Sequence, residues 1–268
     1  MNIIYIKNFN SVDDPVKTEE TINTQLIREA DKIQTDYTYV SLPLAWNINK
    51  VGVRNTQRIL DDVCNTHSDK KLFFVCQHIL VNKLNFHGHL VFTPHATLLD
   101  SYIPIPHYSC TYDLSLVKPW KERKYKFSFM GSFKTHPTRR KLYDYFKEKE
   151  DCLILDTGSW HFEISKKKRE KNARKYIEIL GDTKYSLCPR GTGPSTIRIW
   201  EALAMKSFPV ILSDHLKMPL ELFLRKTLWS RVGEECNDFN INHEVFDNRE
   251  YWEWFCNANL YKSIINIL

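Results

Sequence analysis

Short runs rich in β-branched and aromatic residues alternate along this chain with segments of helical periodicity, and this alternation constrains the fold most strongly. It is typical of parallel sheets covered by helices, because parallel strands need helix-length crossovers. Between Thr111 and Lys126 the sequence becomes charged and irregular, which indicates a domain boundary. We therefore expect an α/β protein with halves at 1–120 and 121–248, and a closing helix over 249–268 that packs back on the first half.

The expected elements follow from the local patterns. In the first half the strands are expected at 2–7, 37–42, 71–76 and 89–94, and the helices at 22–33 and 54–66. In the second half the strands are expected at 126–131, 152–158, 185–189 and 208–214, and the helices at 138–147, 165–180 and 195–205. No internal repeat relates the two halves.

Composition argues against several classes of protein. A chain of 268 residues with 43% hydrophobic content is long enough to form two cores, so disorder is not expected. Lys and Arg exceed Asp and Glu by 38 to 32, a modest excess that favours an anionic small molecule over a nucleic-acid partner. The seven cysteines form no Cys-x-x-Cys pair, and no apolar run reaches membrane-spanning length. We expect a soluble, cytoplasmic protein without a disulfide framework.

The stretch SLCPRGTGPSTIRIWEALAMKSFPVILSD at 186–214 combines a strand, a glycine-rich turn and a segment of helix formers. A strand that ends at Pro189, followed by a turn and a helix from Ser195, would place free backbone N–H groups at the carboxyl edge of a sheet. The Ser195 hydroxyl can cap this helix or donate to a phosphate oxygen, and Thr196 is placed to assist. The pattern predicts a phosphate-binding turn.

Arg198 and Glu201 are the two charged residues of this otherwise apolar helix, and buried charges need partners. The structural alternative is a salt bridge between them at i,i+3, although the acid should precede the base for the better orientation. The ligand alternative assigns Arg198 to a diphosphate and Glu201 to the vicinal hydroxyls of a ribose. We favour a nucleoside diphosphate.

At these residues the sequence resembles the exostosin-like glycosyltransferases, family 47, whose donor half has a CPxG, SxRxxEAL and xPVIxSD pattern. The segments KLFFVCQH, YIPIP and FSFMGS…TRRKL are weaker likenesses, so the resemblance covers roughly 71–229. The chain departs from the pattern chiefly at Lys206 and Ser207, where the family usually has a glycine-bearing turn.

The resemblance implies a GT-B-like architecture, in which two Rossmann-like halves face each other across a cleft, and an inverting transfer from a UDP-sugar. By position it also implies the donor contacts: Gly131, Ser132, Arg139, Arg190, Ser195, Thr196 and Arg198 at the diphosphate, and Glu201 at the ribose. One of the adjacent Arg139 and Arg140 is expected to be a surface charge. Arg190 could equally cover the edge of the sheet.

Neither a metal nor another cofactor is expected. The chain has no Asp-x-Asp motif of the kind that holds a donor diphosphate through a divalent ion. His87 and His89 have strand spacing that could aim both rings at zinc, but this motif alone is a weak signal. Arginines and a helix N-terminus would then stabilise the leaving UDP.

Inversion requires a general base, which the first, acceptor-side half should supply. His78 follows the strand LFFVC directly, where ligands of α/β sheets collect, and it matches a histidine of the family's HFFVxxHD segment. The acid that follows in the family is Ile79 here. A core histidine bonded to the backbone is the alternative, and Asp100 and His95 are the reserve candidates.

The sequence therefore predicts a metal-independent, inverting glycosyltransferase that uses an oligosaccharide or glycoprotein acceptor. We expect neither a signal nor a membrane anchor, and in this the sequence resembles the soluble exostosin-like enzymes of large algal DNA viruses more than the secretory-pathway exostosins. Some of the viral enzymes are xylosyltransferases, so UDP-xylose is the first donor to test. The alternative is a nucleotide-sugar or glycan-binding protein of the same fold. An RNA-binding role for the basic run at 166–170 is less favoured, because the run lacks interleaved aromatic residues.

Overall fold

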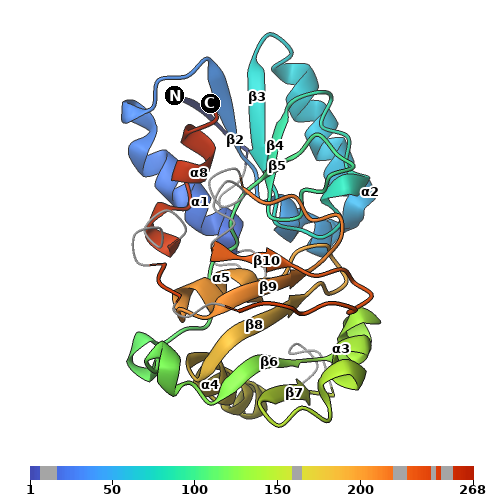
Figure 1. Ribbon diagram of the computed structural model, residues 1–268. Helices are drawn as coiled ribbons and strands as arrows, with labels where there is room; N and C mark the ends of the chain where they lie inside the picture. Colours follow the sequence, from blue (N-terminus) through green and yellow to red (C-terminus); the bar gives the residue numbers. More distant parts are fainter. Residues whose placement is uncertain (7–16, 159–164, 220–227, 243–245, 249–255) are drawn as a thin grey trace. The chain divides into compact units, whose positions relative to one another are not determined.

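The computed structural model describes residues 1–6, 17–158, 165–219, 228–242, 246–248 and 256–268 (Figure 1). The contacts of the chain divide it into two compact units. The first unit comprises Met1–Tyr108, His215–Leu220 and Glu253–Leu268, and the second comprises Ser109–Asp214 and Glu221–Trp252.

The first unit is built on a five-stranded parallel sheet in the order β1-β2-β3-β4-β5. The strands are β1 (Asn2–Tyr5), β2 (Tyr37–Ser41), β3 (Lys71–Val75), β4 (Leu90–Thr93) and β5 (Ile103–Pro104). The α-helices are α1 (Lys17–Glu29), α2 (Leu44–Thr66) and α8 (Lys262–Ile265), and 3-10 turns lie at Ala30–Lys32, Val81–Lys83 and Asn257–Asn259.

Both faces of this sheet are buried, which explains the continuous apolar run in β3. Leu72 and Phe74 point into one core cluster, which includes Leu60 of α2, whereas Phe73 points into the other, which includes Ile22 of α1. Side chains of a strand alternate between its two faces, so one strand serves both clusters.

The C-terminal residues belong to the first unit. Leu260 and Ile264 are fully buried in the same cluster as Phe73, and the Gln25 side chain donates to the Asn257 carbonyl at 2.7 Å. Residues 249–255, where the predicted closing helix would begin, lie outside the described residues. Within 256–268 the α-helical part is α8 alone.

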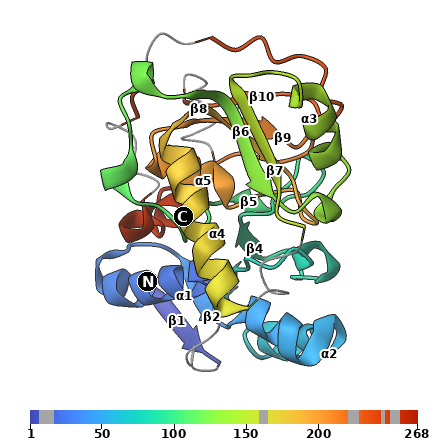
Figure 2. The same ribbon diagram turned by 90° about the horizontal axis from the view of Figure 1, so that it is seen from below.

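The second unit has a five-stranded parallel sheet in the order β10-β9-β8-β6-β7. Its strands are β6 (Tyr125–Gly131), β7 (Cys152–Asp156), β8 (Thr183–Pro189), β9 (Phe208–Leu212) and β10 (Ser230–Arg231). Its helices are α3 (Thr138–Phe146), α4 (Lys166–Gly181) and α5 (Arg198–Ala204), with 3-10 turns at Leu114–Leu116, Trp120–Glu122 and Phe133–Thr135. Helix α3 packs beside β7, α4 against β6 and β8, and α5 against β8 and β9 (Figure 2).

The strand order reverses between β6 and β8. From β6 the chain moves outward to β7, then returns to the other side of β6 to form β8, β9 and β10. At such a point the connections leave neighbouring strands in opposite directions, and ligands of open α/β sheets bind outside the carboxyl ends of these strands. Two α/β units on parallel sheets confirm the predicted fold class, and they are the building blocks of a GT-B-like fold.

The N-terminal stretch of the first unit ends at Tyr108, and the second unit begins at Ser109. The segment after it packs on the second unit, where the Trp120 ring lies 5.5 Å from Tyr185. Arg123 is also buried there, and its guanidinium donates to the carbonyls of Thr183 and Lys206 at 2.7 Å. A buried guanidinium needs such acceptors, and composition could not reveal them.

Three helices begin well away from their predicted positions, and the first is α1, which begins at Lys17 rather than at residue 22. Helix α2 begins at Leu44, and Gly52 interrupts it with φ of 80°, a conformation that glycine adopts without strain. The apolar period is continuous only beyond this break, which explains the later predicted start. Helix α5 begins at Arg198 instead of Ser195. Among the described residues, no helix combines the length and the apolar character that a membrane span requires.

Candidate functional site

Two strand exits meet at the reversal of the second sheet. β6 ends at Gly131 and is followed by Ser132, and β8 ends at Pro189 and is followed by Arg190. The two strands are hydrogen-bonded neighbours and run parallel, so both exits lie at the same edge. Three of the predicted donor contacts therefore lie at the position where an α/β sheet binds ligands.

Arg139 of α3 joins the two exits. Its Nε donates to the Arg190 carbonyl at 2.9 Å, its Nη1 to the Ser132 carbonyl at 3.0 Å, and its Nη2 to the Pro189 carbonyl at 3.4 Å. Burial lowers the pKa of Arg139 to about 10, and the charge of Arg198 contributes to this shift. Arg139 thus holds both loops in place. Its neighbour Arg140 is exposed.

Arg198 is the first residue of α5 and lies against two aromatic rings. Its guanidinium carbon is 4.6 Å from the centre of the Phe129 ring and 4.8 Å from that of Tyr176, and its Nη2 donates to the Met130 carbonyl. Gly131 allows this approach, because a Cβ there would lie 2.9 Å from the Phe129 ring and 3.2 Å from Nη2 of Arg198. The Nε of Arg198 is buried and has no hydrogen-bond partner in the described part of the chain.

Glu201 is buried, but its partner is not Arg198. Its Oε2 accepts a hydrogen bond of 2.8 Å from the Tyr176 hydroxyl, and Thr111 also donates to the carboxylate. Burial raises the pKa of Glu201, whereas these donors and the charge of Arg198 favour the ionised form. No ion pair joins Arg198 and Glu201, so the structural salt bridge considered above is not formed. Ribose binding by Glu201 stays a prediction.

Ser195 and Thr196 lie just before α5 and do not cap it. The N-cap is Ile197, which makes no side-chain cap, and the helix has only seven residues. The predicted helix is present, but it begins at Arg198 rather than at Ser195, so the predicted cap is wrong. The case for an anion at this edge rests on guanidinium groups rather than on a helix N-terminus.

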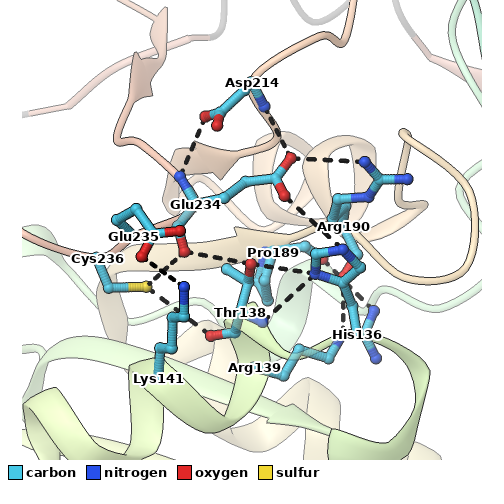
Figure 3. A network of polar contacts seen from close by, with 10 residues as sticks. All are labelled: His136, Thr138, Arg139, Lys141, Pro189, Arg190, Asp214, Glu234, Glu235 and Cys236. Atoms are coloured by element: carbon cyan, nitrogen blue, oxygen red, sulfur yellow. Dashed lines mark hydrogen bonds and ion pairs between the residues drawn. The ribbon is translucent and has the colours of Figure 1, made fainter.

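Arg190 leaves β8 with its backbone N–H bonded to the Leu212 carbonyl at 3.0 Å. Its Nη1 lies 3.6 Å from Oε1 of Glu234, as Figure 3 shows. Its Nε is buried and makes no hydrogen bond with any described residue. Sequence reasoning missed Glu234, because nothing in the local pattern distinguishes it from its neighbour Glu235.

The arginines make this edge strongly cationic. Arg139 and Arg198 are close enough for one charge to lower the pKa of the other. Burial lowers the pKa of His136, and the charges of Arg190 and Arg139 lower it further, against the opposing effect of Glu234. An unpaired buried donor costs about 1–3 kcal/mol, and Arg190 and Arg198 each carry one. The arrangement suits an anion with several oxygens, such as a diphosphate.

The base candidates lie in the first unit, where His78 follows β3. Its Nδ1 accepts the Leu80 N–H at 3.0 Å, so a neutral ring carries its proton on Nε2, which donates to Oδ1 of Asn49 at 3.1 Å. Burial lowers the pKa of this half-buried imidazole. His78 can therefore act as a base only after the ring leaves one of these two partners.

The reserve candidates are more firmly engaged. Asp100 closes its own loop, since Oδ2 accepts from the N–H and the hydroxyl of Thr97, and Oδ1 accepts from Tyr102 N–H at 3.0 Å. His95 is 7% exposed, and burial lowers its pKa to about 4. Asp100 is held by its own loop through both carboxylate oxygens, and His95 is almost fully buried. His78 is half-buried, and one of its ring nitrogens bonds outside its own loop, to Asn49.

Glu19 is a buried acid that sequence reasoning missed. Its carboxylate accepts from Gln77 N–H at 2.7 Å and from Ala45 N–H at 3.1 Å, so it caps the start of α2. Burial raises its pKa to about 8, although these N–H groups favour the carboxylate. On α1 it resembles the neighbouring Glu20, and only tertiary packing separates the fully buried acid from the partly exposed one.

His95 and His107 should make the fold sensitive to acid. Their rings are in T-shaped contact at 5.1 Å, both are buried, and burial lowers both pKa values below 6.5, that of His95 to about 4. A depressed histidine pKa contributes stability that is present above pH 6.5 and is lost as the pH falls towards 4. For His95 alone the loss at pH 5 is about 2 kcal/mol.

Thermal unfolding of the wild type and of His95→Phe at pH 7.5 and pH 5 tests this expectation. The variant should lose less stability on acidification than the wild type. The difference between the two proteins is the quantity to compare, because protonation of Glu19 shifts stability in the opposite direction. His215→Asn, at an exposed position, is the control. An equal loss in wild type and His95→Phe would contradict the assignment.

Among the described residues, no group of three or more His, Cys, Asp or Glu side chains is placed to hold a metal ion. Comparisons with solved structures give only weak likenesses. The chain resembles the GtfA/B complex with a TM-score of 0.38 and 12% identity over 93% of this chain and 59% of that one. It resembles the S. aureus MnaA structure with UDP with a TM-score of 0.30 and 10% identity over 97% of this chain and 71% of that one.

Sequence comparisons are more informative. Ribitol-5-phosphate xylosyltransferase 1 of Danio rerio is 29% identical over 94 residues, which make up 34% of this chain and 21% of that protein. The match therefore spans about a fifth of the relative's length. The model of the exostosin GT47 domain matches residues 64–238, which include β6, β8, both strand exits and all three arginines of the site. This match covers more than half of the 268 residues, and the chain belongs to the exostosin GT47 family of glycosyltransferases.

Proposed function

We propose that this chain transfers a sugar from a UDP-sugar to a hydroxyl of a glycan acceptor, with inversion at the anomeric carbon and without a metal ion. The observation that carries the proposal is the pair of buried, unpaired Nε donors of Arg190 and Arg198 at the reversal of the second sheet. UDP-xylose is the first donor to test, since a matched relative is named a xylosyltransferase.

The arginines would act on the leaving group. As the bond from the anomeric carbon to UDP breaks, UDP keeps the electron pair and negative charge develops on the diphosphate. Arg190 and Arg198 are already held in place by contacts with the protein, so they need little reorganisation to stabilise this charge. Arg139 supports them by fixing both strand exits. Glu201 is the proposed acceptor of ribose hydroxyl bonds.

The acceptor needs a base as its oxygen attacks the anomeric carbon. We propose that His78 takes the proton of the acceptor hydroxyl while the new carbon–oxygen bond forms. Its half-buried ring and lowered pKa keep it neutral at pH 7, which is the state a base requires. The step also requires the ring to give up its contact with Leu80 or Asn49.

A non-catalytic nucleotide-sugar or glycan-binding protein is the second candidate function. The specific observation in its favour is that both ring nitrogens of His78 and both carboxylate oxygens of Asp100 are already bonded. A panel of UDP-sugars, scored for thermal stabilisation and for hydrolysis, separates the two functions. Stabilisation with turnover supports the transferase, and stabilisation without turnover supports the binding protein.

UDP should stabilise the protein in the presence of EDTA. A ligand that binds only the folded state stabilises it by about 2.7 kcal/mol at a hundred times its Kd. Differential scanning fluorimetry with UDP and EDTA measures the shift, and uridine, which lacks the diphosphate, is the control and should give a much smaller one. If EDTA abolished the effect of UDP, the metal-independent mechanism would be wrong.

A further inference from the structure

Glu234 is held in place through its backbone as well as its side chain. Its N–H donates to Oδ1 of Asp214 at 3.1 Å, its carbonyl accepts from the Thr138 hydroxyl at 3.2 Å, and its Oε1 accepts from Asp214 N–H at 3.0 Å (Figure 3). The two acids thus bond reciprocally, and Asp214 follows β9 closely. The Glu234 carboxylate therefore has a defined place at the exits of the second sheet.

This carboxylate faces the cationic edge. Oε1 lies 3.6 Å from Nη1 of Arg190, and Oε2 lies 3.7 Å from Nε2 of His136. The Glu234 and Arg190 side chains are 16% and 22% exposed, so solvent screens their attraction only in part. In the described part of the chain, Glu234 is the acid that pairs with Arg190.

Glu235 provides an internal comparison. The adjacent acid turns to Lys141 of α3, with Oε2 at 2.6 Å from Nζ, and its side chain is 72% exposed. An exposed ion pair of this kind contributes little to stability. Glu234 therefore contacts a proposed donor-binding arginine, whereas its neighbour Glu235 does not.

We propose that Glu234 is a positioning residue that holds Arg190 ready for the donor diphosphate; the inference rests on the proposed function. The long side chain of Arg190 is costly to order. The Glu234 carboxylate, 3.6 Å from its Nη1, offsets this cost before the ligand arrives. Binding then loses less conformational freedom, which raises affinity without an added ligand contact.

The same carboxylate also repels an incoming diphosphate, so a single substitution cannot separate the two effects. A double-mutant cycle with Arg190 does separate them. If Glu234 acts by positioning Arg190, its removal should weaken binding only while the arginine is present. Without the arginine, only the repulsion remains, and removal of Glu234 should leave binding unchanged or strengthen it.

Isothermal titration with UDP, without metal, is the measurement. Glu234→Gln removes the charge but keeps an oxygen for Asp214 N–H, so the fold should persist, which melting of the ligand-free protein checks. We expect Glu234→Gln to raise the Kd for UDP about tenfold, and Glu235→Gln to leave it within about twofold. Arg190→Gln should weaken binding at least as much as Glu234→Gln, and the double variant should bind no more weakly than Arg190→Gln alone.

The outcomes distinguish the inference from the function on which it rests. If wild type fails to bind UDP, or Arg190→Gln binds normally, the proposed arginine site falls and Glu234 falls with it. If Arg190→Gln weakens binding but Glu234→Gln does not, or if the two losses add, the positioning role alone is overturned. If Glu234→Gln does not fold, Glu234→Asp is the second variant to measure. Its shorter side chain keeps the charge but moves the carboxylate away from Arg190, so the same tenfold rise in the Kd for UDP is expected.

Discussion

Replacing His78 by alanine should lower turnover about a hundredfold or more and leave the affinity for UDP nearly unchanged. General base catalysis contributes to the transfer step, whereas the arginines of the second unit are proposed to hold the donor. The measurement is kcat with a UDP-sugar donor, combined with titration of UDP. His67→Ala, at the C-terminal end of α2, is the matched histidine control and should retain turnover.

The pH profile adds a second readout to this experiment. Since burial lowers the pKa of His78, the base is lost only as the pH falls below the ordinary histidine value of about 6.5. Wild-type turnover should therefore show an acidic limb below this value, and the residual activity of His78→Ala should lack it. A variant with undiminished turnover would move attention to Asp100.

Replacing Arg198 by methionine should weaken UDP binding about tenfold to a hundredfold, because a hydrogen bond to a charged group contributes about 1.5–3 kcal/mol. Methionine keeps an unbranched apolar stem beside Phe129 and Tyr176, so the loss should come chiefly from the charge. Titration with UDP measures the effect. Arg140→Met, at an exposed arginine of α3, is the control and should bind normally.

Circular dichroism of Arg198→Met decides between the ligand role and a structural role. The guanidinium also donates to the Met130 carbonyl, at the end of a central strand. If the folded signal were lost together with UDP binding, Arg198 would be a buried structural cation. A folded variant that binds UDP as tightly as wild type would remove Arg198 from the proposed site.

The fold class was predictable because it depends on local patterns. The segments at 71–76 and 126–131 are mostly apolar, and the structure has strands of both sheets there. Strands buried on both faces produce such runs wherever they occur in a parallel sheet. The placement of Arg198 and Glu201 on a buried helix could be read for a similar reason, since two charges among apolar residues stand out without any knowledge of tertiary contacts.

The starts of helices were less predictable. The first turn of a helix leaves its N–H groups without helical partners, so its position depends on what else can bond them. The start of α2 is bonded by Glu19 from another helix, and its break at Gly52 hides the apolar period of its first part. Helix α5 begins at Arg198, after a turn that composition could not distinguish from a capped helix.

By itself, the sequence determined the two α/β units on parallel sheets, the family, and the residue types of the proposed anion site. Only the tertiary structure decided how those residues are used. Arg139 fixes carbonyls of both strand exits, and Glu234 meets Arg190 although the two are far apart along the chain. Such pairs follow from strand order and the reversal between β6 and β8, which no local pattern encodes, because periodicity reports which face is buried and not what lies against it.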